Sequence, residues 1–153
     1  MTETRYHAPG WFTRNIFNRA VRRLARLGIS VWGSRELRVR GRKSGQLRTT
    51  PVNVVTVDDV RYLVAPRGIT EWVRNIRVAS VAELRVGRRV EGIRVVELDD
   101  AAKEPVLRAY LKRWKFEVGM FFEGIDADSP AADIAAIAPG FPVFRIAAQA
   151  PAA

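Results

Sequence analysis

Apolar and polar positions alternate through the middle of the chain, and this alternation predicts β-strands. Between residues 37 and 55 the pattern holds on both sides of a short loop at residues 41–45 that begins and ends with glycine. A period of two on either side of a glycine-bounded loop predicts a β-hairpin. The hairpin is expected to end at Val57, and further strands are predicted at residues 60–65, 82–86, 90–98 and 141–146.

Other stretches repeat apolar residues at intervals of three and four, which predicts helices. Thr70 is expected to cap one of these helices, and Asp99 or Asp100 to cap the next. A dense aromatic stretch at residues 116–122 fits either a lid over a flat ligand or a segment of the core. The predicted helices cover residues 11–28, residues 71–78, a segment that begins between residues 101 and 105 and runs to about 116, and a short alanine-rich segment that Ser129 and Pro130 open.

The predicted strands follow one another without the βαβ alternation of a doubly wound sheet. This order indicates an α+β protein built on a barrel of about six mostly antiparallel strands in meander order, with peripheral helices. At 153 residues the chain fits a single domain. We expect a flexible tail at residues 1–10, a basic amphipathic helix at 11–28, the barrel at 29–147 and a frayed end at 148–153.

Composition excludes several kinds of chemistry. The chain has no cysteine and a single histidine, His7, so disulfides, cysteine nucleophiles, Ser-His-Asp arrangements and zinc sites are not expected. The acidic pairs Asp58-Asp59 and Asp99-Asp100 lie between apolar runs and are interpreted as turn and cap residues. If the protein is an enzyme, a bound cofactor is therefore expected to carry the chemistry.

The net charge of +10 arises entirely within residues 1–50. A negatively charged partner is expected to meet that part of the chain. The helix predicted at residues 11–28 carries arginines on its polar face, and it either packs on the sheet or lies on anionic lipid or over a hydrophobic substrate. The chain has no apolar run long enough to cross a bilayer and no signal-peptide pattern, so we expect a cytoplasmic protein that can touch a membrane surface.

The loop at the tip of the predicted hairpin carries the groups that an anion requires. Gly41 and Gly45 allow close backbone approach. Asn75 lies on a predicted helix, where its amide either faces water or forms hydrogen bonds. The cationic and hydroxyl donors near the tip are Arg42, Lys43, Arg48, Ser44, Thr49 and Thr50, and Arg67 adds a cation at a later strand end.

The order of these features resembles the deazaflavin-dependent nitroreductase family of actinobacteria, which are split β-barrel oxidoreductases that use coenzyme F420. The resemblance rests on G-R-K-S-G-Q-x-R-T-T-P at residues 41–51, A-P-R-G at 65–68 and W-x-x-N-I-R at 72–77. It covers roughly residues 37–146. Leu47, Asn53 and Pro66 depart from the family pattern on the ring and substrate side, which leaves the substrate open.

The resemblance implies a role for each matching position. The anionic tail of F420 would be held by Arg42, Lys43, Ser44, Gly45 and Arg48. The deazaflavin ring would be lined by Thr50, Pro51, Val52 and Asn53, with Arg67, Gly68, Trp72 and Asn75 beside the cofactor. The substrate pocket would comprise Tyr110, Trp114, Phe116, Phe121 and Phe122.

These roles imply an F420H2-dependent oxidoreductase that passes a hydride to a hydrophobic, electron-poor acceptor such as a quinone, an enone, a nitroaromatic compound or an unsaturated acyl chain. The accompanying proton could come from Tyr62, Tyr110, a backbone amide or water. No catalytic residue is assigned, and no metal is expected. The protein is expected to be a monomer or a homodimer.

Two alternatives stay open. The same basic loop could hold the single phosphate of flavin mononucleotide (FMN) in a barrel of the same kind. Residues 11–48 could instead form a non-enzymatic basic module that binds a membrane or a nucleic acid, and binding to a nucleic acid would weaken steeply with salt. The leading interpretation involves no nucleic acid.

Overall fold

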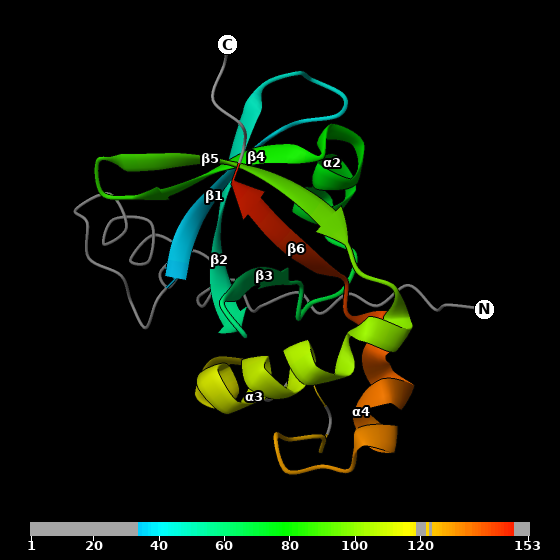
Figure 1. Cartoon of the computed structure of the whole chain (residues 1–153). Coiled ribbons are helices and arrows are strands. Elements are labelled where there is room, and N and C mark those ends of the chain that lie inside the picture. Colours follow the sequence, from blue (N-terminus) through cyan, green and yellow to red (C-terminus); the bar gives the residue numbers. More distant parts are fainter. Residues whose placement is uncertain (1–33, 119–121, 123, 149–153) are drawn as a thin grey trace.

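The structure is a computed structural model that describes residues 34–118, 122 and 124–148. Six strands form a closed barrel in the order β1-β2-β3-β6-β5-β4 (Figure 1). Every neighbouring pair is antiparallel, and the contact between β1 and β4 closes the barrel. The strands are β1 (Ser34–Arg40), β2 (Leu47–Val57), β3 (Val60–Val64), β4 (Val81–Val86), β5 (Arg89–Glu97) and β6 (Val143–Ala148). The α+β barrel expected from the sequence is confirmed.

The meander order is correct for only part of the barrel. β1, β2 and β3 follow one another in space, and β4 pairs with β5, but β6 lies between β3 and β5. A barrel closes only when every strand edge has a partner. β6 pairs with the edges of β3 and β5 that would otherwise have no partner. The local sequence of β6 does not predict that pairing.

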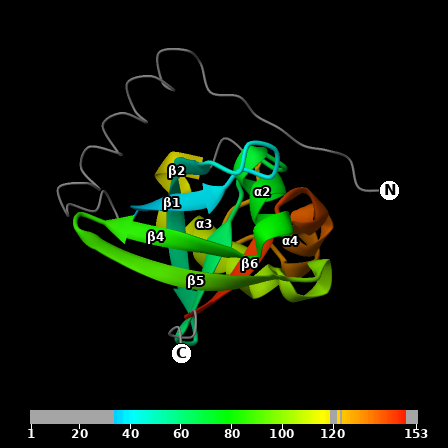
Figure 2. The ribbon, with the colours of Figure 1, turned by 90° about the horizontal axis from the view of Figure 1, so that it is seen from above.

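Helices cover one end and one side of the barrel. They are α2 (Glu71–Ala79), α3 (Glu104–Val118) and α4 (Ala131–Ile137), with single 3-10 turns η2 (Asp100–Ala102) and η4 (Ala138–Gly140). α2 lies against one end of the barrel, whereas α3 and α4 lie together along its side (Figures 1 and 2). None of the helices in the described ranges is both long and apolar enough to cross a membrane. The tail and helix predicted at residues 1–28 lie outside the described residues.

The apolar residues form two separate cores. The first fills the barrel, where Leu37, Leu63 and Ile93 are fully buried and Val73 and Ile76 of α2 pack against them. α2 therefore closes one mouth of the barrel. The second core lies outside the barrel, between the outer faces of β2 and β3 and the layer of α3 and α4.

Charged residues occupy the opposite mouth. Side chains two positions apart on a strand point to the same face of the sheet. The residues two positions before the core residues Leu37, Leu63 and Ile93 therefore also point into the barrel, and they are Arg35, Arg61 and Glu91. Both guanidinium amines of Arg61 donate to the carboxylate of Glu91, at 2.9 and 2.6 Å. This contact lowers the pKa of Glu91 and raises the pKa of Arg61, whereas burial and the charge of Arg61 lower the pKa of Arg35.

The acidic pairs have the structural roles expected of them, with one correction. Asp58 and Asp59 have φ angles of 50° and 65° and form the two-residue turn between β2 and β3, as the left-handed conformation of such hairpin turns requires. Asp99 precedes η2, not the main helix, and makes no side-chain cap hydrogen bond. α3 begins at Glu104, within the range of 101–105 expected for its start, after the separate turn η2.

Polar residues stand at the starts of α3 and α2, and the Lys103 side chain makes contacts there that the sequence did not indicate. Lys103, only 3% exposed, donates from Nζ to the carbonyl oxygen of Ala138 at 3.1 Å and pairs with Asp100 at 2.7 Å. It thereby joins the start of α3 to η4. Thr70 stands at the N-cap position of α2 as expected, but its hydroxyl makes no cap hydrogen bond and is buried without a partner.

Candidate functional site

The candidate site is built on the tip of the β1–β2 hairpin, residues 41–46. The Gly41 amide donates to the carbonyl of Gln46 at 2.8 Å, and the Gly45 amide donates to the carbonyl of Gly41 at 2.9 Å. Gly45 has φ +73°, and a Cβ on Gly41 would lie 2.9 Å from Ser44 Oγ. Both positions therefore favour glycine, because a side chain would strain one and crowd the other. The β-hairpin expected here is confirmed.

α2 holds this tip in place through Asn75, which is 4% exposed. Asn75 Oδ1 accepts a hydrogen bond from the backbone amide of Arg42 at 3.1 Å and another from Arg42 Nη1 at 2.8 Å. The sequence left open whether this amide faces water or forms hydrogen bonds. The structure shows that it bonds to the loop and fixes both the backbone and the side chain of Arg42.

Glu71 is a second partner of Arg42 that the sequence did not reveal. Glu71 Oε2 accepts from Arg42 Nη1 at 2.8 Å, and Glu71 Oε1 lies 3.4 Å from Arg74 Nη1. The hydrogen bond and charge of Arg42 lower the pKa of the Glu71 carboxyl, with a smaller contribution from Arg74. A usable signal existed, because Glu71 and Asn75 are four residues apart and so share one face of the helix.

Cations on the tip itself face solvent. Lys43 and Arg48 are both exposed, and neither pairs with a carboxylate among the described residues. The Ser44 hydroxyl accepts from the Gln46 amide at 3.2 Å, and Arg40 donates from its guanidinium to the carbonyl of Gly45. Hence the loop is internally bonded and presents positive charge outward, which is the arrangement that binds an anion.

The four residues predicted to line a ring do not share one face. Successive side chains of β2 point to opposite sides of the sheet. Val52 is 7% exposed in the barrel core, and Thr50 has the same inward parity. Pro51 and Asn53 point outward, beside Val55 of the second core. The four side chains cannot all face one ligand, since strand alternation divides them into two pairs, and the role of these residues beside a ring stays a prediction.

The other positions predicted to lie beside the cofactor gather near α2. Gly68, with φ +85°, donates its amide to the carbonyl of Ala65 at 3.2 Å and lies three residues before the helix. Trp72 is partly buried against the barrel core, with its ring centroid 5.9 Å from that of Phe144. Arg67 is half-buried in the turn that leads from β3 to α2. Trp72 belongs to α2, which lies next to the hairpin tip (Figure 1), and Arg67 and Gly68 belong to the turn that precedes this helix.

The aromatic residues predicted to form a substrate pocket divide into two groups. Tyr110 and Phe122 are each 1% exposed in the second core, where Phe122 stacks on Phe141 with centroids 4.2 Å apart. They form part of the core and present no surface to an open pocket. Phe121 and the side chains of Trp114 and Phe116 lie outside the described part of the chain.

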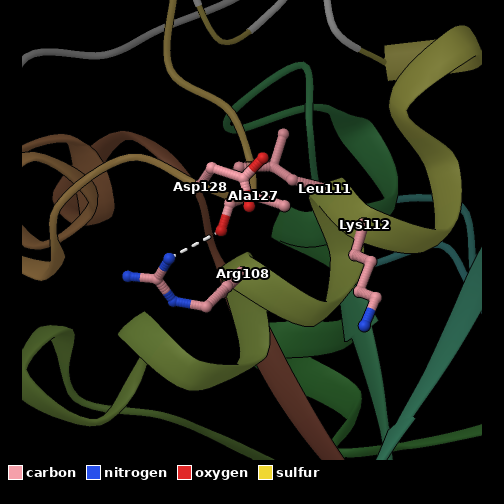
Figure 3. A pocket seen from close by; sticks show the side chains of 5 residues that line it. All are labelled: Arg108, Leu111, Lys112, Ala127 and Asp128. Carbon is pink, nitrogen blue, oxygen red and sulfur yellow. Dashed lines mark hydrogen bonds between the residues drawn. The ribbon is translucent and has the colours of Figure 1, made fainter.

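An open pocket that the sequence did not indicate lies between α3 and the loop before α4 (Figure 3). Arg108 spans one side of it and donates from Nη1 to the carbonyl of Ala127 at 2.6 Å. Its Nε also donates to Glu104 at 2.8 Å. The pocket is lined by Arg108, Leu111, Lys112, Ala127 and Asp128. Within the described ranges, no group of three or more His, Cys, Asp or Glu side chains could hold a metal ion.

Solved structures share this fold. One described as an F420-H2 dependent reductase, FDR-A, has 17% identity and a TM-score of 0.54, and the match covers 75% of this chain and 94% of that one. A chain described as a domain-swapped dimer has 17% identity and a TM-score of 0.51, with 75% and 80% covered. The protein Atu2129 of unknown function from Agrobacterium tumefaciens has 14% identity and a TM-score of 0.55, with 97% and 60% covered. At these identities the likeness establishes the fold.

Sequence comparison identifies the family. No protein of curated function matches the chain. The family model described as F420H(2)-dependent quinone reductase matches residues 13–117, which is more than half of the chain and includes the hairpin tip, α2 and most of α3. The chain therefore belongs to the F420H(2)-dependent quinone reductase family and is an F420-dependent oxidoreductase.

Proposed function

We propose that this protein uses F420H2 to reduce a hydrophobic, electron-poor acceptor, with a quinone as the first candidate. The observation that carries the proposal is the hairpin tip, where α2 fixes Arg42 and where Lys43 and Arg48 are exposed without carboxylate partners among the described residues. The tail of F420 carries a phosphodiester and several carboxylates. A row of cations on a rigid loop fits such a tail better than it fits a neutral ligand.

Individual residues would hold the cofactor as follows. Arg42, Lys43 and Arg48 would bind the anionic groups of the tail, with Ser44 and the backbone of Gly45 beside them. Pro51 and Asn53, on the outer face of β2, are the predicted ring residues that could meet the deazaflavin with their side chains. Thr50 and Val52 would contribute only backbone groups there, because their side chains point inward. When bound, the reduced deazaflavin supplies the hydride.

The two tyrosines proposed as proton donors differ in exposure. Tyr110 is 1% exposed in the second core, so its hydroxyl is not presented to an acceptor. Tyr62 on β3 is only partly buried at the edge of the same core. We therefore assign the proton to Tyr62, a backbone amide or water, in preference to Tyr110.

Direct binding tests this proposal. Purified protein is titrated with F420 and with the same deazaflavin lacking the phosphate and glutamyl groups, and turnover is then measured with a quinone and an enone. We expect F420 to bind much more tightly than the tailless form. A double variant, Lys43→Ala with Arg48→Ala, should lose about tenfold or more in affinity, since each charge-assisted contact is worth about 1 kcal/mol or more.

Arg94→Ala is the matched control, because Arg94 is an exposed strand arginine on β5. It should leave affinity unchanged. Absence of F420 binding at micromolar protein would rule out the proposal. If only the quinone or only the enone turns over, the acceptor class is narrowed accordingly.

FMN is the competing cofactor, because the tip could also hold one phosphate. Arg42 and Lys43 on the tip and Arg48 at the start of β2 together favour the longer tail. Co-purified yellow colour with a single bound phosphate would favour FMN instead.

We also propose a test of oligomeric state, prompted by the structural neighbour described as a domain-swapped dimer. Light scattering on the purified chain distinguishes a homodimer from a monomer.

A further inference from the structure

We propose that Glu71 is an internal competitor of the ligand tail: its carboxylate occupies Arg42 in the free protein and must leave before an anionic group binds there. The proposal rests on the proposed function for the identity of the natural ligand. The contact itself is a feature of the structure, since Glu71 Oε2 lies 2.8 Å from Arg42 Nη1. A carboxylate on an arginine of an anion site is the group that an incoming anion has to replace.

The two partners are held very differently. The Arg42 side chain is 20% exposed and bonds also to the buried Asn75, which fixes its position. The Glu71 side chain is 71% exposed on the first turn of α2, and among the described residues its carboxylate contacts only Arg42 and Arg74. Glu71 can therefore rotate into solvent at little cost while Arg42 stays where an anion would meet it.

This competition affects ligands unequally. A ligand with one anionic group that binds Arg42 exchanges one carboxylate contact for another contact of similar kind. A ligand with several anionic groups makes the same exchange and also meets the exposed cations Lys43 and Arg48. Glu71 therefore removes a larger share of the binding free energy from a singly charged tail, which favours a polyanionic one.

Release of Glu71 from Arg42 should also change the pKa of the Glu71 carboxyl. Arg42 from the hairpin and Arg74 from α2 are the charged groups that act on the Glu71 carboxyl, and together they hold its pKa below the ordinary value of 4.5. An anion that takes over Arg42 removes the larger of these two influences and adds a negative charge nearby. The pKa of Glu71 must then rise.

Affinity measurements on three proteins test the proposal. The dissociation constant for F420 is measured at pH 7 for the wild type, for Glu71→Gln and for Glu97→Gln. The control is matched, because Glu97 also pairs with an exposed arginine, Arg77, at 2.9 and 2.7 Å and its substitution changes net charge equally. We expect Glu71→Gln to bind about two- to fivefold more tightly, the range for an exposed ion pair, and Glu97→Gln to bind like the wild type.

A second measurement uses inorganic tripolyphosphate, so that the outcome does not depend on F420. Carboxyl NMR follows the titration of Glu71 with and without saturating tripolyphosphate, and we expect its pKa to be higher when the anion is bound. Unchanged affinity in Glu71→Gln, or an unchanged Glu71 pKa with anion bound, overturns the proposal. If F420 fails to bind while tripolyphosphate binds more tightly to Glu71→Gln, the cofactor assignment is wrong and the competitor role stands.

Discussion

Replacing Asn75 by alanine should weaken both the fold and the ligand site. Asn75 is 4% exposed, and its Oδ1 accepts from the Arg42 backbone amide at 3.1 Å and from Arg42 Nη1 at 2.8 Å. Truncation leaves a partly buried amide and a guanidinium without this acceptor, which costs about 1–3 kcal/mol for the unsatisfied groups. For a chain of this size, 2 kcal/mol corresponds to a decrease in Tm of about 4–8 °C.

Urea unfolding of Asn75→Ala and titration with F420 measure the two effects. We expect the free energy of unfolding to fall by about 2 kcal/mol and the affinity for F420 to fall as well, because the freed loop must be ordered on binding. Asn75→Asp retains an acceptor at Oδ1 and adds a charge facing Arg42, so it should recover much of the stability. Gln46→Ala is the control, since the exposed Gln46 uses its backbone, not its side chain, in the tip.

The reasoning is refuted if Asn75→Ala unfolds at the wild-type urea concentration and binds F420 with wild-type affinity. A loss of stability without any loss of affinity would show that Asn75 stabilises α2 but does not organise the tip. Equal losses in Asn75→Ala and Gln46→Ala would show that any change in this region has the same effect.

Three further predictions concern the hairpin, the second core and the mouth of the barrel opposite α2. Gly45→Ala should reduce stability by about 1 kcal/mol in thermal unfolding, because Gly45 has φ +73° and the open space around it leaves backbone strain as the only cost; an unchanged Tm would contradict this. Phe122→Ala should cost about 3–5 kcal/mol in urea unfolding, because Phe122 is 1% exposed and stacks on Phe141 at 4.2 Å; a cost below about 1 kcal/mol would show that the second core is not tightly packed. Hydrogen bonds from Arg61 are the main reason why the pKa of Glu91 in the folded protein is lowered from 4.5. The Glu91 carboxylate therefore adds to the free energy of unfolding above pH 4.5, and this contribution is lost as the pH falls through the folded pKa. Glu91→Gln should therefore be less stable than the wild type by about 0.5 kcal/mol at pH 7, and the difference should vanish in acid; a difference that is constant with pH would contradict the assignment.

Much of the site could be predicted because its residues are adjacent in sequence. The local pattern alone placed the cations Arg42, Lys43 and Arg48 within one hairpin. Asn75 was recognised as informative, but its partner is 33 residues away along the chain. Glu71 looked like an ordinary acidic residue in a first helical turn, and only the approach of α2 to the hairpin gives it a role.

The alternation of side chains along β2 shows a second reason why part of the site could not be predicted from the sequence. The likeness to a family suggested that Thr50, Pro51, Val52 and Asn53 line a ring, but a strand turns alternate side chains to opposite faces. The face of β2 that belongs to the barrel interior depends on which apolar residues the other strands supply. The aromatic stretch that contains Phe122 fits both a lid and a core from sequence alone, since the same aromatic residues can cover a ligand or fill a core.

The sequence by itself determined the elements and the chemistry of the tip: the hairpin, the strands and helices of the described region, the positive loop and the absence of cysteine. These follow from periodicity, turn residues and charge, which act over a few positions. Only the tertiary structure decided that β6 completes the barrel between β3 and β5 and that α2 closes one mouth. It also decided that Asn75 and Glu71 meet Arg42. These contacts join segments far apart in the chain, and they form because strand edges and buried polar groups require partners wherever the fold can supply them.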